Sequence, residues 1–346
     1  MDRHNNFDVL RLIAATSVIF SHAFLIGEGQ QNSEPLMRIT GGQCVLGVAG
    51  VFVFFTISGF LVTQSFEATD SAPRFFAKRA LRIYPGLLVC LAASAFLLGP
   101  LVSTWPIAEY LRDAAPYRYV VSNFSMIMPS HMLPGVTFSG YGAGTVIDGP
   151  LWTLPSEVSM YLMVGALGLL RALDLRLVLA LVAVGMIGIW FDTASSDYFV
   201  GSALWLLPFF AAGMVLYRLR DRGIFRGRIA LVALAGLILS IRLHAFILLF
   251  PVFGSYLVIY LALERRLPAI KAARFGDLSY GLYIYGWPVE QVLVHLHGGG
   301  MRWPDLFALA LPLTAALAFL SWHLVEAPAL RLKPGNRQMT ARAATL

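Results

Sequence analysis

Long apolar runs, most of them about 20 residues in length, alternate along the chain with short polar connections. A helix needs about 20 mostly apolar residues to cross a bilayer, and backbone groups cannot stay unpaired in lipid. The pattern therefore predicts an all-α integral membrane protein, a bundle of about ten transmembrane helices. The expected helices span residues 7–26, 45–65, 84–104, 151–172, 177–192, 199–217, 229–244, 245–263, 278–297 and 305–325.

Composition supports a membrane protein and argues against nucleic acid as a partner. Of the 346 residues, 58% are hydrophobic and 13% are charged, whereas a soluble domain is about half apolar and a quarter charged. The sequence pI of about 9.6 comes from short basic clusters between the apolar runs, which is typical of membrane topology. Cys44 and Cys90 are the only cysteines, and no metal site is expected. The partner that composition predicts is the lipid bilayer.

Basic residues fall mainly in every second connection between the apolar runs. One alternate set of connections, with the C-terminal tail, holds nineteen Lys and Arg residues, and the other set holds four. By the positive-inside rule the first set is cytoplasmic, as are both termini. We therefore expect a multi-pass protein of the cell inner membrane, with a single transmembrane domain over residues 1–330 and a basic, disordered cytoplasmic tail over 331–346.

The first apolar run contains an arginine and a histidine, Arg11 and His22. Eleven helical steps make three turns plus about 20°, so the two side chains share a face, about 16 Å apart along the axis. One interpretation is a snorkelling arginine and a histidine bonded to a neighbouring helix. The other, which we favour, is that they line one cavity, because ionisable groups at membrane depth usually face a protein interior or water. Neutral histidine there can act as a general base on a hydroxyl.

A basic cluster precedes the third apolar run, and Arg79 and Arg82 lie three residues apart within it. They should share one helix face. Such clusters commonly orient the protein and contact lipid headgroups. The alternative is a phosphate clamp, because arginine binds phosphate oxygens in a bidentate fashion. The sequence leaves both interpretations open.

Further polar candidates lie at helix starts and within apolar runs. Glu157 opens the fourth run, where it either suits the helix dipole or orients a histidine across the bundle. Ser58 lies in a Ser-Gly pair that is typical of helix packing. Tyr280 and Tyr283 open the ninth run and are either interfacial belt residues or share an inward face. The connection 105–150 keeps several aromatic residues, including Tyr141, as loops at a cavity mouth do.

Taken together, these motifs resemble the acyltransferase-3 family of membrane acyltransferases, from Phe7 to Pro328. The resemblance is carried by four motifs in order: Phe-Asp-x-Leu-Arg with a histidine eleven residues after its arginine, Ile-Ser-Gly-Phe-Leu at 57–61, Arg-x-x-Arg-Ile-x-Pro at 79–85, and Trp-Thr-Leu-x-x-Glu at 152–157. It implies a ten-helix membrane O-acyltransferase that passes an acyl group, usually acetyl, from cytoplasmic acetyl-CoA to a hydroxyl of a cell-surface or lipid-linked glycan.

The resemblance also implies roles for residues. His22, Glu157 and Arg11 would be catalytic, with Glu157 orienting His22; Arg79, Arg82 and Arg11 would bind the acyl-CoA. Tyr141, Ser58, Tyr280 and Tyr283 are the expected acceptor-binding residues.

The sequence departs from the family at Gly286, where similar sequences often have histidine shortly before the proline. Some relatives also append an extracytoplasmic hydrolase-like domain, whereas this chain ends about twenty residues after its last span. We therefore expect the membrane domain to act alone, as a homo-oligomer, or with a separate extracytoplasmic transferase. Two other functions fit the same residues: a transporter or flippase of glycan intermediates with Arg11 and His22 as a proton relay, and an acyltransferase for a small hydrophobic molecule.

Overall fold

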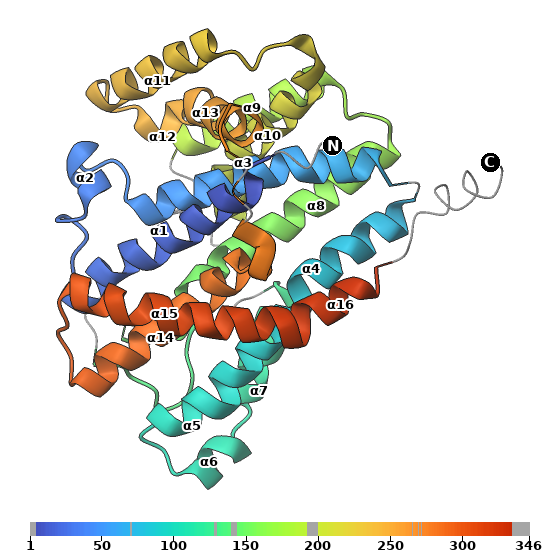
Figure 1. Ribbon diagram of the computed structural model, residues 1–346. Helices are drawn as coiled ribbons and strands as arrows, with labels where there is room; N and C mark the ends of the chain where they lie inside the picture. Colours follow the sequence, from blue (N-terminus) through green and yellow to red (C-terminus); the bar gives the residue numbers. More distant parts are fainter. Residues whose placement is uncertain are drawn as a thin grey trace.

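The computed structural model describes residues 5–69, 71–127, 130–139, 144–191, 200–264, 266–268, 270 and 272–333. These residues form helices and no strand, as the apolar pattern predicts (Figure 1). Each expected membrane range contains helix. The principal helices are α1 (Phe7–Glu28), α3 (Leu46–Glu67), α4 (Ala72–Ala93), α8 (Thr153–Leu169), α9 (Leu175–Trp190), α10 (Val200–Arg218), α11 (Gly227–Arg242), α13 (Phe253–Leu263), α14 (Ser279–His297) and α15 (Trp303–Ser321).

Shorter elements connect these helices. α2 (Pro35–Ile39) precedes α3, and α6 (Ile107–Arg112) and α7 (Ala115–Ser125) lie in the long connection after α4, next to α5 (Gly99–Val102). A 3₁₀ turn at Gly149–Trp152 leads into α8. Others lie at Arg220–Arg222 and Ala272–Phe275.

Helix α1 lies at the centre of the packing that forms the site. It packs against α3, α14 and α15, and α3 in turn packs against α10, which carries α9 on its other side (Figure 1). Its buried residues lie on several faces, including Ala15, Ile19 and Phe24, because neighbouring helices cover it on more than one side. Arg11 and His22 are thus held on one continuous helix inside the bundle, as predicted.

Two glycines bring α3 and α10 into backbone contact. A Cβ at Gly59 would lie 1.9 Å from the Phe210 carbonyl oxygen, and a Cβ at Gly213 would lie 2.1 Å from the Thr56 carbonyl oxygen. Small residues permit this close approach in membrane helices, where dispersion contacts drive association. The helix-packing interpretation of the Ser-Gly pair is therefore correct for Gly59, whereas Ser58 faces a cavity.

Five of the described helical segments are long and apolar enough to cross a membrane: Phe7–Glu28, Leu46–Glu67, Ala72–Val102, Val200–Arg218 and Trp303–Arg331. Large apolar side chains also point outward, among them Leu101, Leu170 and Trp190. A soluble protein rarely exposes so much contiguous apolar surface. The chain is therefore a helical membrane protein.

The boundaries differ from the expected ranges in three places. The third helix begins at Ala72, twelve residues early, so the basic cluster is helical and Arg79 and Arg82 lie within it. The expected helix 245–263 is broken into α12 (Phe246–Leu249) and α13, because Pro251 cannot continue the hydrogen-bonding ladder. The last helix does not end at residue 325 but continues through a π-helical turn into α16 (Ala327–Arg331).

A π-helical turn, Trp322–Glu326, joins α15 to α16. Such turns are rare and often lie at functional sites. Here the turn leaves Glu326 with only 2% of its surface exposed, and its Oε1 accepts a hydrogen bond from Ser321 Oγ at 3.0 Å. The turn therefore directs a carboxylate into the bundle, toward α4.

Candidate active site

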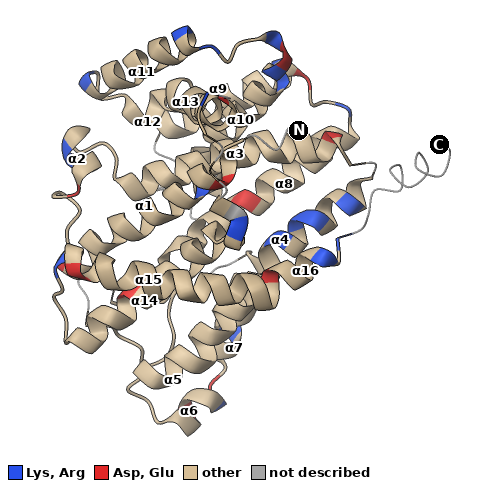
Figure 2. Cartoon of the chain, viewed as in Figure 1, with Lys and Arg blue, Asp and Glu red and all other residues tan. Residues whose placement is uncertain are grey.

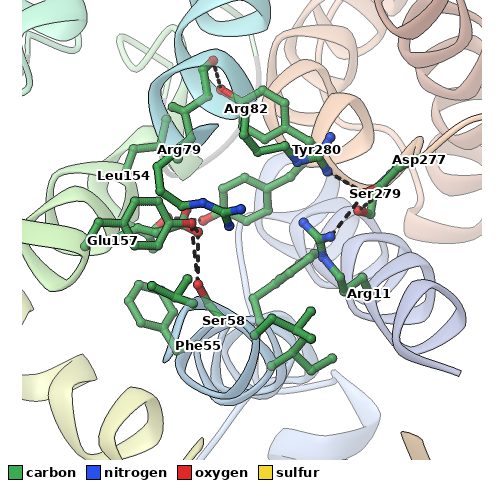
Figure 3. A pocket seen from close by; sticks show the side chains of 18 of the residues that line it. Arg11, Phe55, Ser58, Arg79, Arg82, Leu154, Glu157, Asp277, Ser279 and Tyr280 are labelled. Carbon is green, nitrogen blue, oxygen red and sulfur yellow. Dashed lines mark hydrogen bonds and ion pairs between the residues drawn. The ribbon is translucent and has the colours of Figure 1, made fainter. Parts of the chain in front are cut away.

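A cavity of about 350 Å³ lies among α1, α3, α4, α8 and α14. We call it the arginine cavity, because Arg11, Arg79 and Arg82 line it together with Lys333. Figure 3 shows Arg79 and Arg82 of α4, Arg11 of α1 and Glu157 of α8 pointing inward. Figure 2 shows Lys and Arg gathered along the N-terminal half of α4 and at α16, so the cavity lies beside the basic end of these helices.

Arg82 is held by two carboxylates. Its Nη2 lies 2.5 Å from Asp277 Oδ2 and its Nη1 lies 3.6 Å from Glu326 Oε2. Arg11 Nη1 contacts the same Asp277 oxygen at 3.1 Å. One carboxylate therefore connects α1 to α4, and it is fixed in turn because Ser279 Oγ donates to its other oxygen at 2.6 Å.

The electrostatic setting keeps Asp277 ionised. Burial alone would raise the pKa of this carboxyl, but the Arg11 and Arg82 guanidinium groups outweigh it and hold the pKa well below its usual range. The carboxylate therefore stays ionised at physiological pH.

Arg79 differs from its neighbour on the same helix. Its Nε is buried and has no hydrogen-bond partner among the described residues. The guanidinium lies over the Tyr161 ring, 5.9 Å from its centroid. Because no carboxylate of the described residues pairs with Arg79, its donors can bind an anionic ligand.

Lys333 adds a further cation where the C-terminal segment lines the arginine cavity. Burial lowers the pKa of this amine, and the positive charges of Arg79, Arg82 and Lys78 lower it further. Like charges brought this close indicate an anion site, since only an anion would relieve their repulsion.

Glu157 lies on the same cavity, in a small hydrogen-bonded group. Tyr161 Oη donates to Glu157 Oε1, and Ser58 Oγ lies 3.4 Å from the same oxygen. Ser58 and Glu157 thus both line the arginine cavity, and their expected roles in acceptor binding and catalysis stay predictions. Tyr280 and Tyr283 also line this cavity. The two tyrosines therefore lie on one inward face of α14, which is one of the two interpretations that the sequence left open.

A second cavity, of about 170 Å³, surrounds His22. We call it the histidine cavity. Its lining is mainly apolar and aromatic, with Trp152 and Trp287 beside Ser21 and Gln31. The His22 ring meets the edge of Trp287 with centroids 4.8 Å apart. Arg11 and His22 thus face two adjoining cavities. The expectation that they line one cavity is wrong, because the three turns of α1 between them, about 16 Å, place them at different cavities along the helix.

The carboxylate beside His22 is Glu290 of α14. Its Oε2 lies 3.6 Å from His22 Nδ1, and its side chain is fully buried. Neither Glu290 oxygen has a hydrogen-bond partner among the described residues. The expectation that Glu157 orients His22 is therefore not met, because Glu157 is engaged with Ser58 and Tyr161 on the arginine cavity.

Gly286 lies where α14 passes α1. A Cβ at this position would lie 2.9 Å from Ile19 Cγ1, so a larger side chain would require α1 to move or repack. Glu290 lies one helical turn further along α14 and reaches His22 instead. In this chain the α14 side chain presented to His22 is therefore a carboxylate.

Sequence reasoning missed Glu290, Asp277, Glu326 and Lys333 as parts of the site. Glu290 carried a usable signal, since it is an ionisable residue in an apolar membrane-length run. The other three are recognised only from contacts between distant segments. Tyr141 lies outside the described residues. Among those that are described, no three His, Cys, Asp or Glu side chains are grouped to hold a metal ion.

Comparison with known proteins supports an enzyme. The sequence profile of the acyltransferase domain, the acyltransferase-3 family, matches residues 4–323. An O-acetyl transferase of Shigella phage Sf6 is 31% identical, covering 94% of this chain and 96% of the relative. Nodulation protein 10 of Rhizobium leguminosarum bv. viciae is 30% identical over 95% and 94%, and acyltransferase MdmB of Streptomyces mycarofaciens is 26% identical over 96% and 93%. No solved structure matches the chain.

Proposed function

The chain belongs to the acyltransferase-3 family and is an O-acyltransferase, and from that premise we propose that it transfers an acetyl group from cytoplasmic acetyl-CoA to a hydroxyl of a cell-surface or lipid-linked glycan. The observation that carries the proposal is the pair of adjoining cavities. One is lined by cations beside the basic end of the bundle, and the other holds a histidine paired with a buried carboxylate.

The donor enters the arginine cavity. Arg79 and Lys333 bind its phosphates, because Arg79 is unpaired among the described residues and Lys333 lies among like charges. Arg82 also binds the phosphates, to the extent that its contacts with Asp277 and Glu326 leave its donors free. Arg11, further along the cavity, donates to the oxygen atoms of the donor's amide-containing arm. The thioester end then points along α1 toward His22.

The chemistry takes place at the histidine cavity. Neutral His22 accepts the proton of the acceptor hydroxyl while the hydroxyl oxygen attacks the thioester carbonyl carbon. The new C–O bond forms, the C–S bond breaks, and the thiolate of CoA takes the proton back from the imidazolium. Glu290 stabilises the imidazolium that exists between the two transfers, because the two groups are 3.6 Å apart in a buried setting.

The acceptor approaches His22 from the side opposite the donor. Trp152, Trp287 and Gln31 line the histidine cavity, and aromatic faces with a few polar groups are typical of small-ligand sites. The name of the phage relative, an O-acetyl transferase, supports acetyl as the group transferred. A glycan acceptor is the part of the proposal that rests on the family resemblance.

The orientation follows from loop charge. We place the basic end of α4 and α16 at the cytoplasm, with both termini there and all ten principal helices crossing the inner membrane. Arg11, near the start of α1, and Lys333, after α16, line the same cavity, which supports this placement. Acetyl-CoA is cytoplasmic, so the basic end is where the donor is available.

The test is direct transfer. Purified protein in lipid nanodiscs is incubated with acetyl-CoA labelled in the acetyl group and with lipid-linked glycan from a deletion strain. We expect label in the glycan as an ester that mild alkali releases, and free CoA in equal amount. Movement of the glycan across the bilayer without label would contradict the proposal and favour a flippase.

A further inference from the structure

Two side chains line both cavities, Val51 of α3 and Tyr283 of α14. No other residue of the described part of the chain is common to the two linings. The arginine cavity and the histidine cavity therefore adjoin at this pair, and a group that passes from one to the other passes between them.

The Tyr283 ring is fixed in place. Its hydroxyl donates to the Pro150 carbonyl oxygen at 3.0 Å and lies 2.6 Å from Thr153 Oγ1. The ring also meets Phe54 edge-on, with centroids 5.7 Å apart. Two hydrogen bonds and one ring contact hold the side chain against α8 and α3, so it cannot easily turn aside.

Val51 is fixed by the packing of its helix. The α3 backbone lies tightly against α1 on one side, since a Cβ at Gly47 would lie 2.9 Å from Ser21 Cβ and one at Gly50 would lie 2.8 Å from the Ala14 carbonyl oxygen. On the other side, Gly59 and Gly213 hold α3 against α10. The valine side chain has two methyl groups and one preferred rotamer in a helix, so it holds a fixed place in the wall between the two cavities.

We propose that Val51 and Tyr283 form a constriction that selects the length of the acyl group. This inference rests on the proposed function, and deepens it by naming the determinant of donor specificity. The reacting carbonyl must reach His22, so the whole acyl group has to pass between these two side chains, and the methylenes of a chain longer than acetyl have to fit in the histidine cavity of about 170 Å³, whose wall Val51 and Tyr283 help to form. A fixed valine and a fixed ring leave little room for them.

The experiment measures kcat/KM for acetyl-, butyryl- and hexanoyl-CoA with purified protein in nanodiscs. Val51→Ala should raise the butyryl-to-acetyl ratio about tenfold, since one methylene in a fitted pocket is worth about tenfold or more in kcat/KM. Val51→Ile should lower the same ratio and leave acetyl transfer measurable. The two variants change the opening in opposite directions, so a folding defect in one does not remove the test.

The matched control is Val62→Ala, the same change on the same helix at a residue that lines the arginine cavity only. Its butyryl-to-acetyl ratio should equal that of the wild type. Tyr283→Phe keeps the ring and removes both hydrogen bonds, and should raise the ratio by a smaller factor than Val51→Ala.

An unchanged ratio in Val51→Ala and Val51→Ile, with acetyl transfer intact, would overturn the constriction and leave the proposed function standing. The same would follow if Val62→Ala shifted the ratio as far as Val51→Ala. Failure of the wild-type protein to transfer any of the three acyl groups would overturn the proposed function and the constriction with it.

Discussion

The two cavities that meet at Val51 and Tyr283 handle charge in opposite ways. Four cationic side chains line the arginine cavity, and two of them, Arg11 and Arg82, form ion pairs with carboxylates. The histidine cavity is smaller and mainly apolar, with one imidazole and one carboxylate facing each other. In the proposed reaction the first cavity holds the highly charged donor and the second moves one proton, and this chain keeps the two apart.

The largest effect should come from His22→Ala. We expect kcat for acetyl transfer to fall by about 10³-fold, because a positioned general base contributes roughly 10²- to 10⁴-fold. Donor binding should be unchanged, because His22 does not line the arginine cavity. Transfer of labelled acetyl groups measures the fall in kcat, and equilibrium binding of CoA measures donor binding separately. Undiminished transfer, or a parallel loss of binding, would erase the distinction between the cavities.

Arg79→Ala should act on the other cavity. We expect the Kd for CoA to rise by about 10- to 100-fold, since a hydrogen bond to a charged group contributes about 1.5–3 kcal/mol. The replacement leaves no carboxylate of the described residues unpaired. Isothermal titration in nanodiscs measures the change. Arg74→Ala is the control, because it removes the same charge from α4 at a residue that does not line the cavity; equal effects of the two would argue against a specific clamp.

Glu290→Gln should lower kcat about tenfold and leave KM for acetyl-CoA unchanged, because the carboxylate stabilises an imidazolium that exists only during transfer. Glu290→Asp, which keeps the charge, should recover part of the loss. Steady-state kinetics with saturating acceptor separates kcat from KM. A rise in KM with normal kcat, or no difference between the Gln and Asp variants, would make Glu290 a packing residue only.

Lys333 should give the smallest effect and a dependence on pH. Burial and the nearby Arg79, Arg82 and Lys78 lower the pKa of its amine, so the amine loses its positive charge at a lower pH than an ordinary lysine does. As the pH rises from neutral toward the usual lysine pKa of about 10.4, the Kd for a non-hydrolysable acetyl-CoA analogue should rise about threefold, in keeping with a partly exposed charge pair. Lys333→Arg should remove this dependence, because arginine stays protonated. A pH dependence that persists in Lys333→Arg would assign it to another group.

The sequence was sufficient where periodicity decides. Arg11 and His22 lie on one helix because the run from Phe7 to Glu28 is mostly apolar around them, and the face they share follows from helical geometry. Arg79 and Arg82 follow by the same argument. The helical fold class and the membrane setting also come from the lengths of the apolar runs.

Contacts between distant segments decide the rest. Asp277 is an unremarked loop residue until α1 and α4 bring two arginines to it. Glu326 points inward only because a π-helical turn rotates the end of α15. Topology led to Glu157 as the partner of His22, because both lie toward the same face of the membrane. Only packing shows that Glu157 lines the arginine cavity and that α14 presents Glu290 to His22.

The Asp277 carboxylate, which joins Arg11 to Arg82, affects how the proposed donor would bind and how its product would be released. Asp277 already satisfies the two guanidinium groups, so a phosphate that reaches Arg82 replaces one anion with another instead of adding charge to an empty site. Binding of this kind is an ion exchange. The Asp277 carboxylate is displaced from Arg82, stays next to the site, and pairs with Arg82 again when the product leaves. In the proposed reaction, Asp277 therefore limits the affinity for the donor and speeds the release of CoA, which favours turnover over tight retention.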